Sequence, residues 1–218
     1  MIVPNKIISE PKLYENYHKD FEFESLFHTI SVSKRIIKKV FKYKRKGTVL
    51  HYGCGKSILL QLLKNLDWDV YGIDISKEAI EFNLNNNIPT HKSSYFGRNM
   101  FDVIVARNLI EHLPDPKGFL SEMRRILKSD GIFMLSTPNT DSINFMVNKK
   151  KVMDYPEHLY LFNRKNLTRL FGKLFYVEEY FNTNGWLGIF ERASFVQTVG
   201  RIVSNILNRQ GEMVFILR

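Results

Sequence analysis

The sequence contains one cysteine among its 218 residues, which excludes an internal disulfide framework. No uninterrupted apolar run approaches the roughly 20 residues that a membrane-spanning helix needs. No apolar segment of the kind found in secretory signal peptides follows the initial methionine. From these absences we expect an intracellular, cytoplasmic protein.

Internal repeats, linkers and low-complexity segments are also absent from the sequence. Hydrophobic residues make up 44% of the chain and charged residues 25%, as is typical of a globular rather than a disordered protein. A chain of 218 residues is long enough to bury a full core. The sequence therefore predicts a single domain over residues 1–218.

Acidic residues are fewer than basic ones, 22 against 32, so the net charge is +10. Eight basic residues crowd the segment 34–46, and such a cluster can meet nucleic acid, an anionic membrane or a phosphorylated substrate. Apolar residues recur at helical spacing from about Phe23 to Tyr43, which favours the solvated face of an amphipathic helix. No nucleic-acid motif accompanies the charge, and we expect no nucleic-acid partner.

A glycine turn is the most informative pattern in the chain. The apolar run that begins at Val49 ends in Gly53-Cys54-Gly55, and a helix-compatible apolar segment begins at Ile58. An α/β sheet presents a ligand-binding turn in this way, at the carboxyl end of a strand. Glycine at such a turn lets the backbone approach a ligand that a Cβ atom would push away.

Three classes of ligand compete for this turn. A dinucleotide fingerprint needs a third glycine where the chain has Ile58, and a phosphate-binding P-loop ending in Lys56 and Ser57 needs a glycine where the chain has Leu50. The third pattern is the Asp-x-Gly-x-Gly-x-Gly motif that opens class I S-adenosyl-L-methionine (SAM) methyltransferases. The chain resembles it, with His51 in place of the acid and Ser57 in place of the last glycine.

An acidic residue follows the next predicted strand, about twenty residues after the glycines. This strand spans residues 68–73 and leads into Asp74-Ile75-Ser76. A carboxylate at the tip of a neighbouring strand can accept two hydrogen bonds from ribose hydroxyls. The alternative is that Asp74 or Ser76 only caps the helix that follows.

A longer resemblance begins at Phe101. The segment 101–116 combines a Phe-Asp start, an apolar strand, Glu-His-Leu and Asp-Pro, and residues 119–139 add a helix and a strand ending in Thr-Pro-Asn. These motifs resemble the ubiquinone-biosynthesis-type O-methyltransferase branch of class I SAM-dependent methyltransferases, over roughly residues 47–175. Residues 127–131 stand where this branch often has a Leu-Lys-Pro-Gly-Gly turn before the fifth strand, and Gly131 keeps the glycine that such a turn most needs for a positive φ. The resemblance implies an α/β, Rossmann-like fold with a seven-stranded, mostly parallel sheet of order 3-2-1-4-5-7-6. Its last strand is antiparallel, and helices cover both faces.

The resemblance also implies S-adenosyl-L-methionine as the cofactor. Ser93 or Ser94 lies where many relatives carry an acid that recognises adenine and could accept that hydrogen bond, and Asn108 follows the fourth strand at its ligand-binding end. Asp102 begins that strand, at the end away from the ligand, so we expect it to be structural. The predicted cofactor-binding residues are His51, Gly53, Cys54, Gly55, Asp74, Ile75, Ser94 and Asn108.

His158 is the predicted catalytic residue. It lies in a Glu-His-Leu-x-x-Phe segment whose histidine faces the acceptor in the resembled branch. An imidazole titrates near neutral pH and can take a proton from an attacking hydroxyl, although His158 can also serve only to fix its loop. Some members bind a divalent metal through Glu-x-x-Glu-His. Here Asn108 replaces the first acid and leaves Glu111 and His112, so no metal site is predicted.

Two flanking segments complete the predicted domain: an amino-terminal helical lid or cap at residues 1–46, and a helical insertion at 184–210 before the last strand. The insertion can serve as a substrate lid, a dimer surface, a peripheral membrane contact or ordinary packing. The leading hypothesis is methyl transfer from SAM to a hydroxyl oxygen of a small-molecule or glycan acceptor. The alternatives are a binding or regulatory protein on a decayed methyltransferase fold, and a P-loop nucleotide hydrolase that depends on Lys56.

Overall fold

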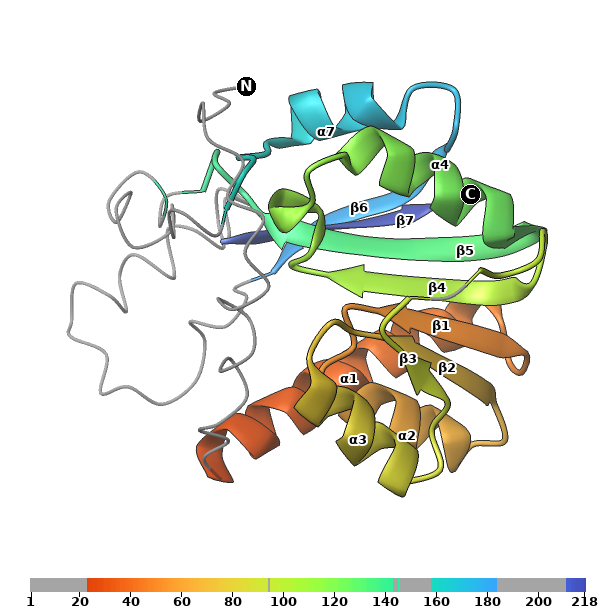
Figure 1. Ribbon diagram of the computed structural model, residues 1–218. Helices are drawn as coiled ribbons and strands as arrows, with labels where there is room; N and C mark the ends of the chain where they lie inside the picture. The colour runs from red at the N-terminus through yellow and green to blue at the C-terminus, as the bar shows by residue number, and fades with distance from the viewer. Residues whose placement is uncertain (1–22, 94, 143–144, 146–157, 184–210) are drawn as a thin grey trace. The chain divides into compact units, whose positions relative to one another are not determined.

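The computed structural model describes residues 23–93, 95–142, 145, 158–183 and 211–218 (Figure 1). The rest of the predicted lid, the predicted insertion at 184–210 and Ser94 lie outside the described residues. The main elements follow in chain order: α1 (Phe23–Tyr43), β1 (Thr48–Tyr52), α2 (Ile58–Lys64), β2 (Asp69–Ile73), α3 (Lys77–Asn85), β3 (Thr90–His91), β4 (Phe101–Arg107), η2 (Ile110–His112), α4 (Pro116–Ile126), β5 (Leu127–Pro138), α7 (Arg164–Phe171), β6 (Val177–Thr183) and β7 (Glu212–Leu217).

The seven strands are hydrogen-bonded in the order β3-β2-β1-β4-β5-β7-β6, which confirms the predicted topology. β1 pairs in parallel with both β2 and β4, and β2 pairs in parallel with β3. β6 and β7 are antiparallel, as predicted for the last strand. The carboxyl ends of β1 and β2 therefore lie at the same edge of the sheet, so that the turns after them are neighbours.

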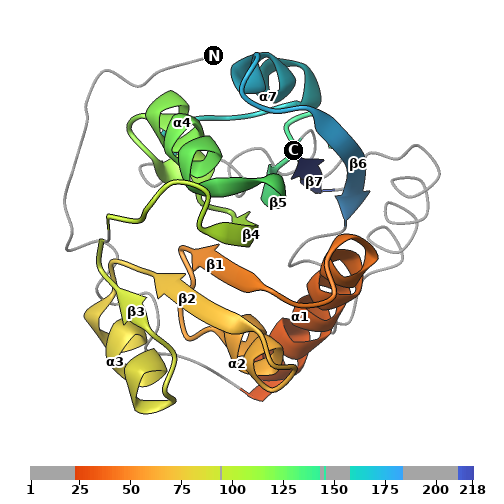
Figure 2. The same cartoon turned by 90° about the vertical axis from the view of Figure 1, so that its right-hand side faces the viewer.

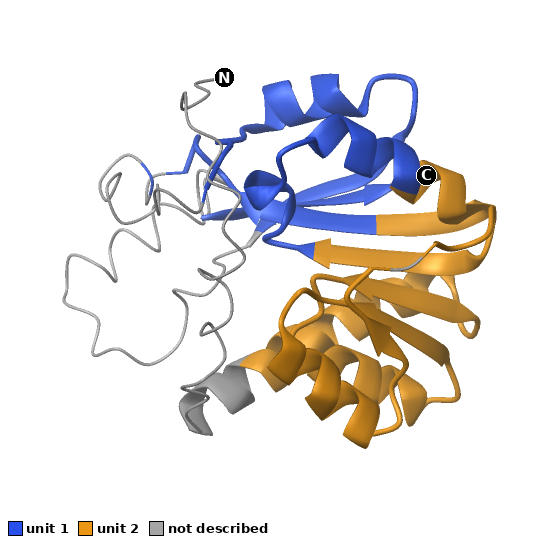
Figure 3. Cartoon of the chain, viewed as in Figure 1, with its two compact units in different colours: residues 1–8, 107–122, 134–218 blue, residues 9–106, 123–133 orange. Residues whose placement is uncertain are grey.

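The chain forms two compact units (Figure 3). Unit 2 contains the described parts of 9–106 and 123–133, and unit 1 contains the described parts of 107–122 and 134–218. The glycine turn and Asp74 belong to unit 2, whereas Asn108 and His158 belong to unit 1.

Unit 2 is built on strands with nearly continuous burial. Val49 and Leu50 of β1 are fully buried, as is the run from Val103 to Ala106 in β4, which is typical of a parallel sheet covered on both faces. α1, α2 and α3 lie on the same side of β1, β2 and β3 (Figure 2). Phe41 of α1 stacks on Trp68, with ring centroids 6.2 Å apart.

The described part of α1 shows the amphipathic pattern that the sequence predicts. Ile36 and Val40 are buried, whereas Lys34, Arg35 and Lys38 are exposed. These three basic residues therefore lie on a solvated face of the helix.

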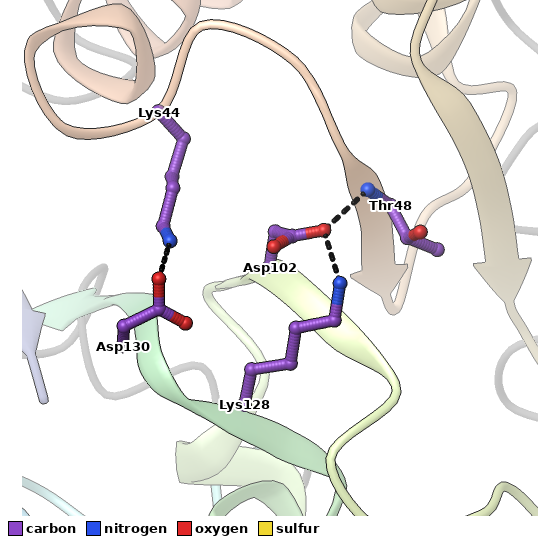
Figure 4. Close-up of polar contacts among 5 residues, drawn as sticks. All are labelled: Lys44, Thr48, Asp102, Lys128 and Asp130. Atoms are coloured by element: carbon purple, nitrogen blue, oxygen red, sulfur yellow. Dashed lines mark hydrogen bonds and ion pairs between the residues drawn. The ribbon is translucent and has the colours of Figure 1, made fainter.

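Asp102 joins three chain segments at the edge of the sheet away from the glycine turn (Figure 4). Its Oδ2 accepts hydrogen bonds from the Thr48 backbone N–H at 2.9 Å and from Lys128 Nζ at 2.8 Å. Lys44 forms an ion pair with Asp130 beside it. These contacts tie the start of β1 to the starts of β4 and β5, in agreement with the structural role predicted for Asp102.

The prediction for the start of β5 is wrong. A turn over residues 127–131 was expected before it, but α4 ends at Ile126 and β5 begins at Leu127. Gly131 is not among the glycines with positive φ. A Cβ atom there would crowd the Leu127 side chain at 2.8 Å and the Asp102 carbonyl oxygen at 3.1 Å. The glycine therefore permits close packing within the sheet rather than a tight turn.

Unit 1 is built around β7, in which every residue is buried. Phe215 of β7 meets Phe171 of α7 edge to face, with ring centroids 5.1 Å apart. Asn163 caps α7, because its Oδ1 accepts the Asn166 N–H at 2.9 Å and the Asn166 Oδ1 accepts the Asn163 N–H at 2.8 Å. Among the described residues of the chain, no helix combines the length and apolar character needed to cross a bilayer.

Candidate functional site

The glycine turn follows β1 directly and is anchored to the end of β2. Gly53 and Gly55 have φ values of 70° and 52°, a region that strongly favours glycine. The backbone N–H groups of Gly53 and Cys54 both donate to the Ile73 carbonyl oxygen, at 2.8 and 3.0 Å. The turn is therefore held where β1 and β2 end together.

Asp74 connects the glycine turn to the helix after β2. Its Oδ2 accepts the Gly55 N–H at 2.6 Å, and its Oδ1 accepts the Ser76 N–H at 2.9 Å. Ser76 caps α3 through a bond from the Ala79 N–H at 3.3 Å. Each Asp74 oxygen retains a second lone pair, so the carboxylate can still accept hydrogen bonds from ribose hydroxyls. Ile75, the next residue, is 51% exposed and offers an apolar surface beside it.

Asn83 is a residue of this site that the sequence analysis missed. It lies on α3 and is fully buried. Its Oδ1 accepts the Ser57 N–H at 3.1 Å, while its Nδ2 donates to the Gly55 carbonyl oxygen at 2.8 Å and to Cys54 Sγ at 3.5 Å. The available signal was a polar residue four positions after Ala79, on the buried face of this helix.

The two departures from the methyltransferase motif lie against each other. His51 Nδ1 and Ser57 Oγ are 3.0 Å apart, and both side chains are buried. Ser57 also caps α2, because its Oγ accepts the Leu60 N–H at 3.2 Å. His51 and Ser57 therefore form one buried polar unit that links the end of β1 to the start of α2.

Two further side chains of the turn have structural partners. Burial raises the pKa of the Cys54 thiol, which keeps it protonated and poorly nucleophilic. Lys56 forms a 2.6 Å ion pair with Glu78 and lies 5.7 Å from the centroid of the Phe82 ring. A P-loop lysine instead reaches toward the nucleotide phosphates, so these contacts weigh against the hydrolase alternative.

In unit 1, Asn108 follows β4 with a φ of 44°. Its backbone N–H donates to the Ser136 carbonyl oxygen at 3.0 Å. Asn108 Oδ1 and Ser136 Oγ are both buried and lack a hydrogen-bond partner among the residues that the structure describes. Buried polar atoms are normally paired, so these two oxygens are candidates for contact with a bound group or water.

Glu111, His112 and His158 form a second cluster in unit 1. The Glu111 side chain is buried, and its Oε2 accepts a hydrogen bond from Thr137 Oγ1 at 2.9 Å. Glu111 Oε1 lies 4.0 Å from His112 Nε2, and the two imidazole centroids are 4.7 Å apart. The Glu111 carbonyl oxygen accepts the Leu159 N–H at 2.8 Å, which holds the loop that carries His158.

The cluster offers two kinds of chemistry. One ligand atom from each of the three residues lies within 4.8 Å of the others, so they could hold a metal ion. The sequence analysis counted two of these ligands, and the fold adds His158 as the third. Burial raises the pKa of Glu111 to about 8, and the charge of Glu212 adds to this shift. At neutral pH without a cation, Glu111 is therefore largely protonated.

The predicted site residues thus fall into two groups. Unit 2 contains His51, Gly53, Cys54, Gly55, Asp74 and Ile75. Unit 1 contains Asn108 and His158, and Ser94 is outside the described residues.

The strand order and the two turns of unit 2 define a class of protein. A sheet of order 3-2-1-4-5-7-6, with a glycine turn after its first strand and an acidic residue after its second, is that of class I SAM-dependent methyltransferases. Residues 25–174 match the family model Methyltransf_23, described as a methyltransferase domain. The chain belongs to this family, and its cofactor is S-adenosyl-L-methionine.

Curated relatives include ubiquinone biosynthesis O-methyltransferases. The protein from Haemophilus ducreyi is 29% identical over 106 residues, covering 42% of this chain and 45% of the relative. The protein from Actinobacillus pleuropneumoniae serotype 7 is 31% identical over 106 residues, with the same coverage of 42% and 45%. The matches thus span less than half the length of these relatives.

Solved structures show the same fold at low sequence identity. A SAM-dependent methyltransferase from Archaeoglobus fulgidus superposes with a TM-score of 0.65 at 19% identity, covering 90% of this chain and 99% of that one. A methyltransferase from Mesorhizobium loti gives a TM-score of 0.64 at 11% identity, covering 85% and 97%. These similarities confirm the Rossmann-like methyltransferase fold.

Proposed function

We propose that this protein transfers a methyl group from SAM to a hydroxyl oxygen of a small metabolite or glycan. The main support for SAM binding at this turn is the hydrogen bond from the Gly55 N–H to Asp74. This bond holds the glycine turn next to the acid that is proposed to bind ribose. The hydroxyl acceptor is supported by the relatives named as O-methyltransferases.

The cofactor supplies a methyl group already activated on a sulfonium. The residues around the turn therefore need to bind and align it rather than to activate it. In this proposal Gly53, Cys54 and Gly55 present backbone to the cofactor, while Asp74 accepts the ribose hydroxyls. SAM carries no phosphate, so engagement of Lys56 by Glu78 does not weaken the proposal.

His158 is the proposed general base for the acceptor hydroxyl. Its imidazole lies beside that of His112, and Glu111 is the nearby carboxyl. Because Glu111 is largely neutral at pH 7, it adds little negative charge that would hold an imidazole in its protonated form. An imidazole in the neutral form can accept a proton as the hydroxyl attacks.

The same cluster supports a second candidate, in which a divalent cation assists methyl transfer. Glu111, His112 and His158 would be its ligands, and the specific observation is their mutual distance of at most 4.8 Å. A cation would favour the ionised form of Glu111 and could polarise the acceptor hydroxyl. The base and cation candidates predict different responses to a chelator.

The decayed-fold alternative rests on three departures in the sequence: His51 in place of the acid, Ser57 in place of the last glycine, and no acid at the position that recognises adenine. The structure describes the first two. These side chains form a buried hydrogen-bonded pair, and Ser57 still caps α2. The departures are therefore compatible with an intact turn.

Release of S-adenosylhomocysteine tests the proposed function. The full chain is incubated with SAM and a panel of hydroxylated metabolites and glycans, each matched to its amine analogue, with EDTA or with added Mg²⁺ or Mn²⁺. We expect turnover with a hydroxyl acceptor but not with its amine analogue. Turnover confined to amines would refute O-methylation, and a chain that does not bind SAM would favour the decayed fold.

His158→Asn separates the roles proposed for the cluster. If His158 is the base, we expect kcat to fall by roughly 10²- to 10⁴-fold, with the KM for SAM unchanged and wild-type turnover resistant to EDTA. Abolition of wild-type turnover by EDTA, with recovery on adding Mn²⁺, would instead support the cation. An unchanged kcat in His158→Asn would exclude the base role.

A further inference from the structure

Asn83 supplies the glycine turn with a matched donor and acceptor. Its amide accepts from the Ser57 N–H and donates to the Gly55 carbonyl oxygen, so that one buried side chain holds backbone groups on both sides of Lys56. A carboxylate here would offer acceptors only, and an apolar side chain would leave both backbone groups without this partner. Such unpaired groups are costly when buried.

The His51–Ser57 pair supports the same segment through the Ser57 side chain. Ser57 has a φ of −72°, so its position does not require glycine. Its side chain carries an oxygen that meets His51 Nδ1 at 3.0 Å and caps α2 through Leu60. The serine and the histidine that depart from the motif therefore make a contact that a glycine at position 57 could not make.

We propose that Asn83 and the His51–Ser57 pair form a buried brace that positions the glycine turn for SAM. This inference rests on the proposed function, in which that turn contacts the cofactor. The three brace residues act through the backbone of the turn and are positioning residues rather than catalytic ones. A turn that is already ordered loses less conformational freedom on binding, which raises affinity without an added contact.

Calorimetry with S-adenosylhomocysteine tests the Asn83 part of the brace. Asn83→Asp keeps the side-chain size but loses the amide donor, and Asn83→Ser is a smaller alternative if the aspartate variant does not fold. Titrations are made at a temperature at which circular dichroism shows each variant fully folded. We expect a dissociation constant raised about tenfold or more, as is typical when a ligand-binding segment loses its support.

Asp102→Asn is the matched control. It weakens a partly buried polar contact of unit 2 at the opposite edge of the sheet, where Asp102 holds Thr48 and Lys128. We expect a lower melting temperature with affinity within about twofold of wild type. Equal weakening of binding by Asp102→Asn and Asn83→Asp would show a general loss of structure and overturn the brace.

A double-mutant cycle tests the His51–Ser57 part. His51→Leu and Ser57→Ala each break the pair, so the double variant should bind S-adenosylhomocysteine no more weakly than the weaker-binding single variant. Ser57→Thr, which keeps the hydroxyl, should restore most of the affinity that Ser57→Ala loses. If the two single increases in the dissociation constant multiply in the double variant, the pair's role is overturned. It is also overturned if Ser57→Thr binds as weakly as Ser57→Ala.

The outcomes separate this inference from the proposed function. If the wild-type chain binds neither SAM nor S-adenosylhomocysteine, the cofactor site itself is wrong. If the wild type binds and every folded brace variant binds equally well, the brace is wrong while the cofactor site stands.

Discussion

Burial of Glu111 predicts a loss of stability as the pH rises. Its carboxyl is almost fully buried and accepts a hydrogen bond from Thr137. Burial raises its pKa from 4.5 to about 8, whereas in the unfolded chain it titrates near the ordinary value. Between these two values the folded state keeps a proton that the unfolded state has released, so the free energy of unfolding decreases with increasing pH.

The pKa difference sets the size of the effect. Multiplying the interval between 4.5 and about 8 by about 1.4 kcal/mol per unit gives a loss of up to about 5 kcal/mol, most of which has occurred by about pH 8. Glu111→Gln removes the titration and keeps an oxygen that can accept the bond from Thr137. The variant should lack this loss, so its stability relative to wild type should rise between about pH 5 and pH 8.

Urea unfolding of both proteins at several pH values, with EDTA present, measures this difference. The chelator is needed because a cation bound to the cluster would favour the carboxylate. Glu178→Gln is the matched control, because this glutamate of β6 is 41% exposed and lies 3.6 Å from Arg218. Parallel stability curves for wild type and Glu111→Gln would refute the reasoning, as would an equal rise in Glu178→Gln.

Two further predictions concern unit 2. Asp74→Ala should weaken SAM binding tenfold or more, on the order of 1.5 to 3 kcal/mol for charged hydrogen bonds, and unchanged affinity by calorimetry would reject the ribose assignment. Gly47→Ala should lower the free energy of unfolding by about 1 to 3 kcal/mol, because Gly47 has a φ of 149° and a Cβ atom would collide with the Asp102 carboxyl. Gly97→Ala, whose Cβ would meet nothing within 4 Å, should change stability by less than about 0.5 kcal/mol in the same urea titration.

Local patterns predicted most of the described elements correctly. Ser76 caps the helix that follows the second strand, and the glycine turn follows a buried strand. Each of these features depends on residues a few positions apart, which is why the sequence shows them. The prediction of a turn before β5 was wrong, because Gly131 permits close packing against Asp102 of β4 rather than forming a local turn. That packing is a long-range contact, which local patterns do not show.

The candidate site was predicted only in part. The glycines and Asp74 could be found because their spacing reflects a strand, a turn and a helix of ordinary length. The role of Asn83 could not be found, because it depends on α3 packing against a turn more than twenty residues earlier in the chain. The approach of His158 to Glu111 likewise depends on a loop held by backbone hydrogen bonds.

The sequence alone thus determined the class of fold, the cofactor and the turn that is proposed to bind it, because periodicity and motif spacing are properties of neighbouring residues. The tertiary structure decided which side chains support that turn, that the two motif departures at His51 and Ser57 form a pair, and that Glu111 is buried deeply enough to keep its proton near neutral pH. These features depend on burial and on contacts between distant segments, which exist only after the chain has folded.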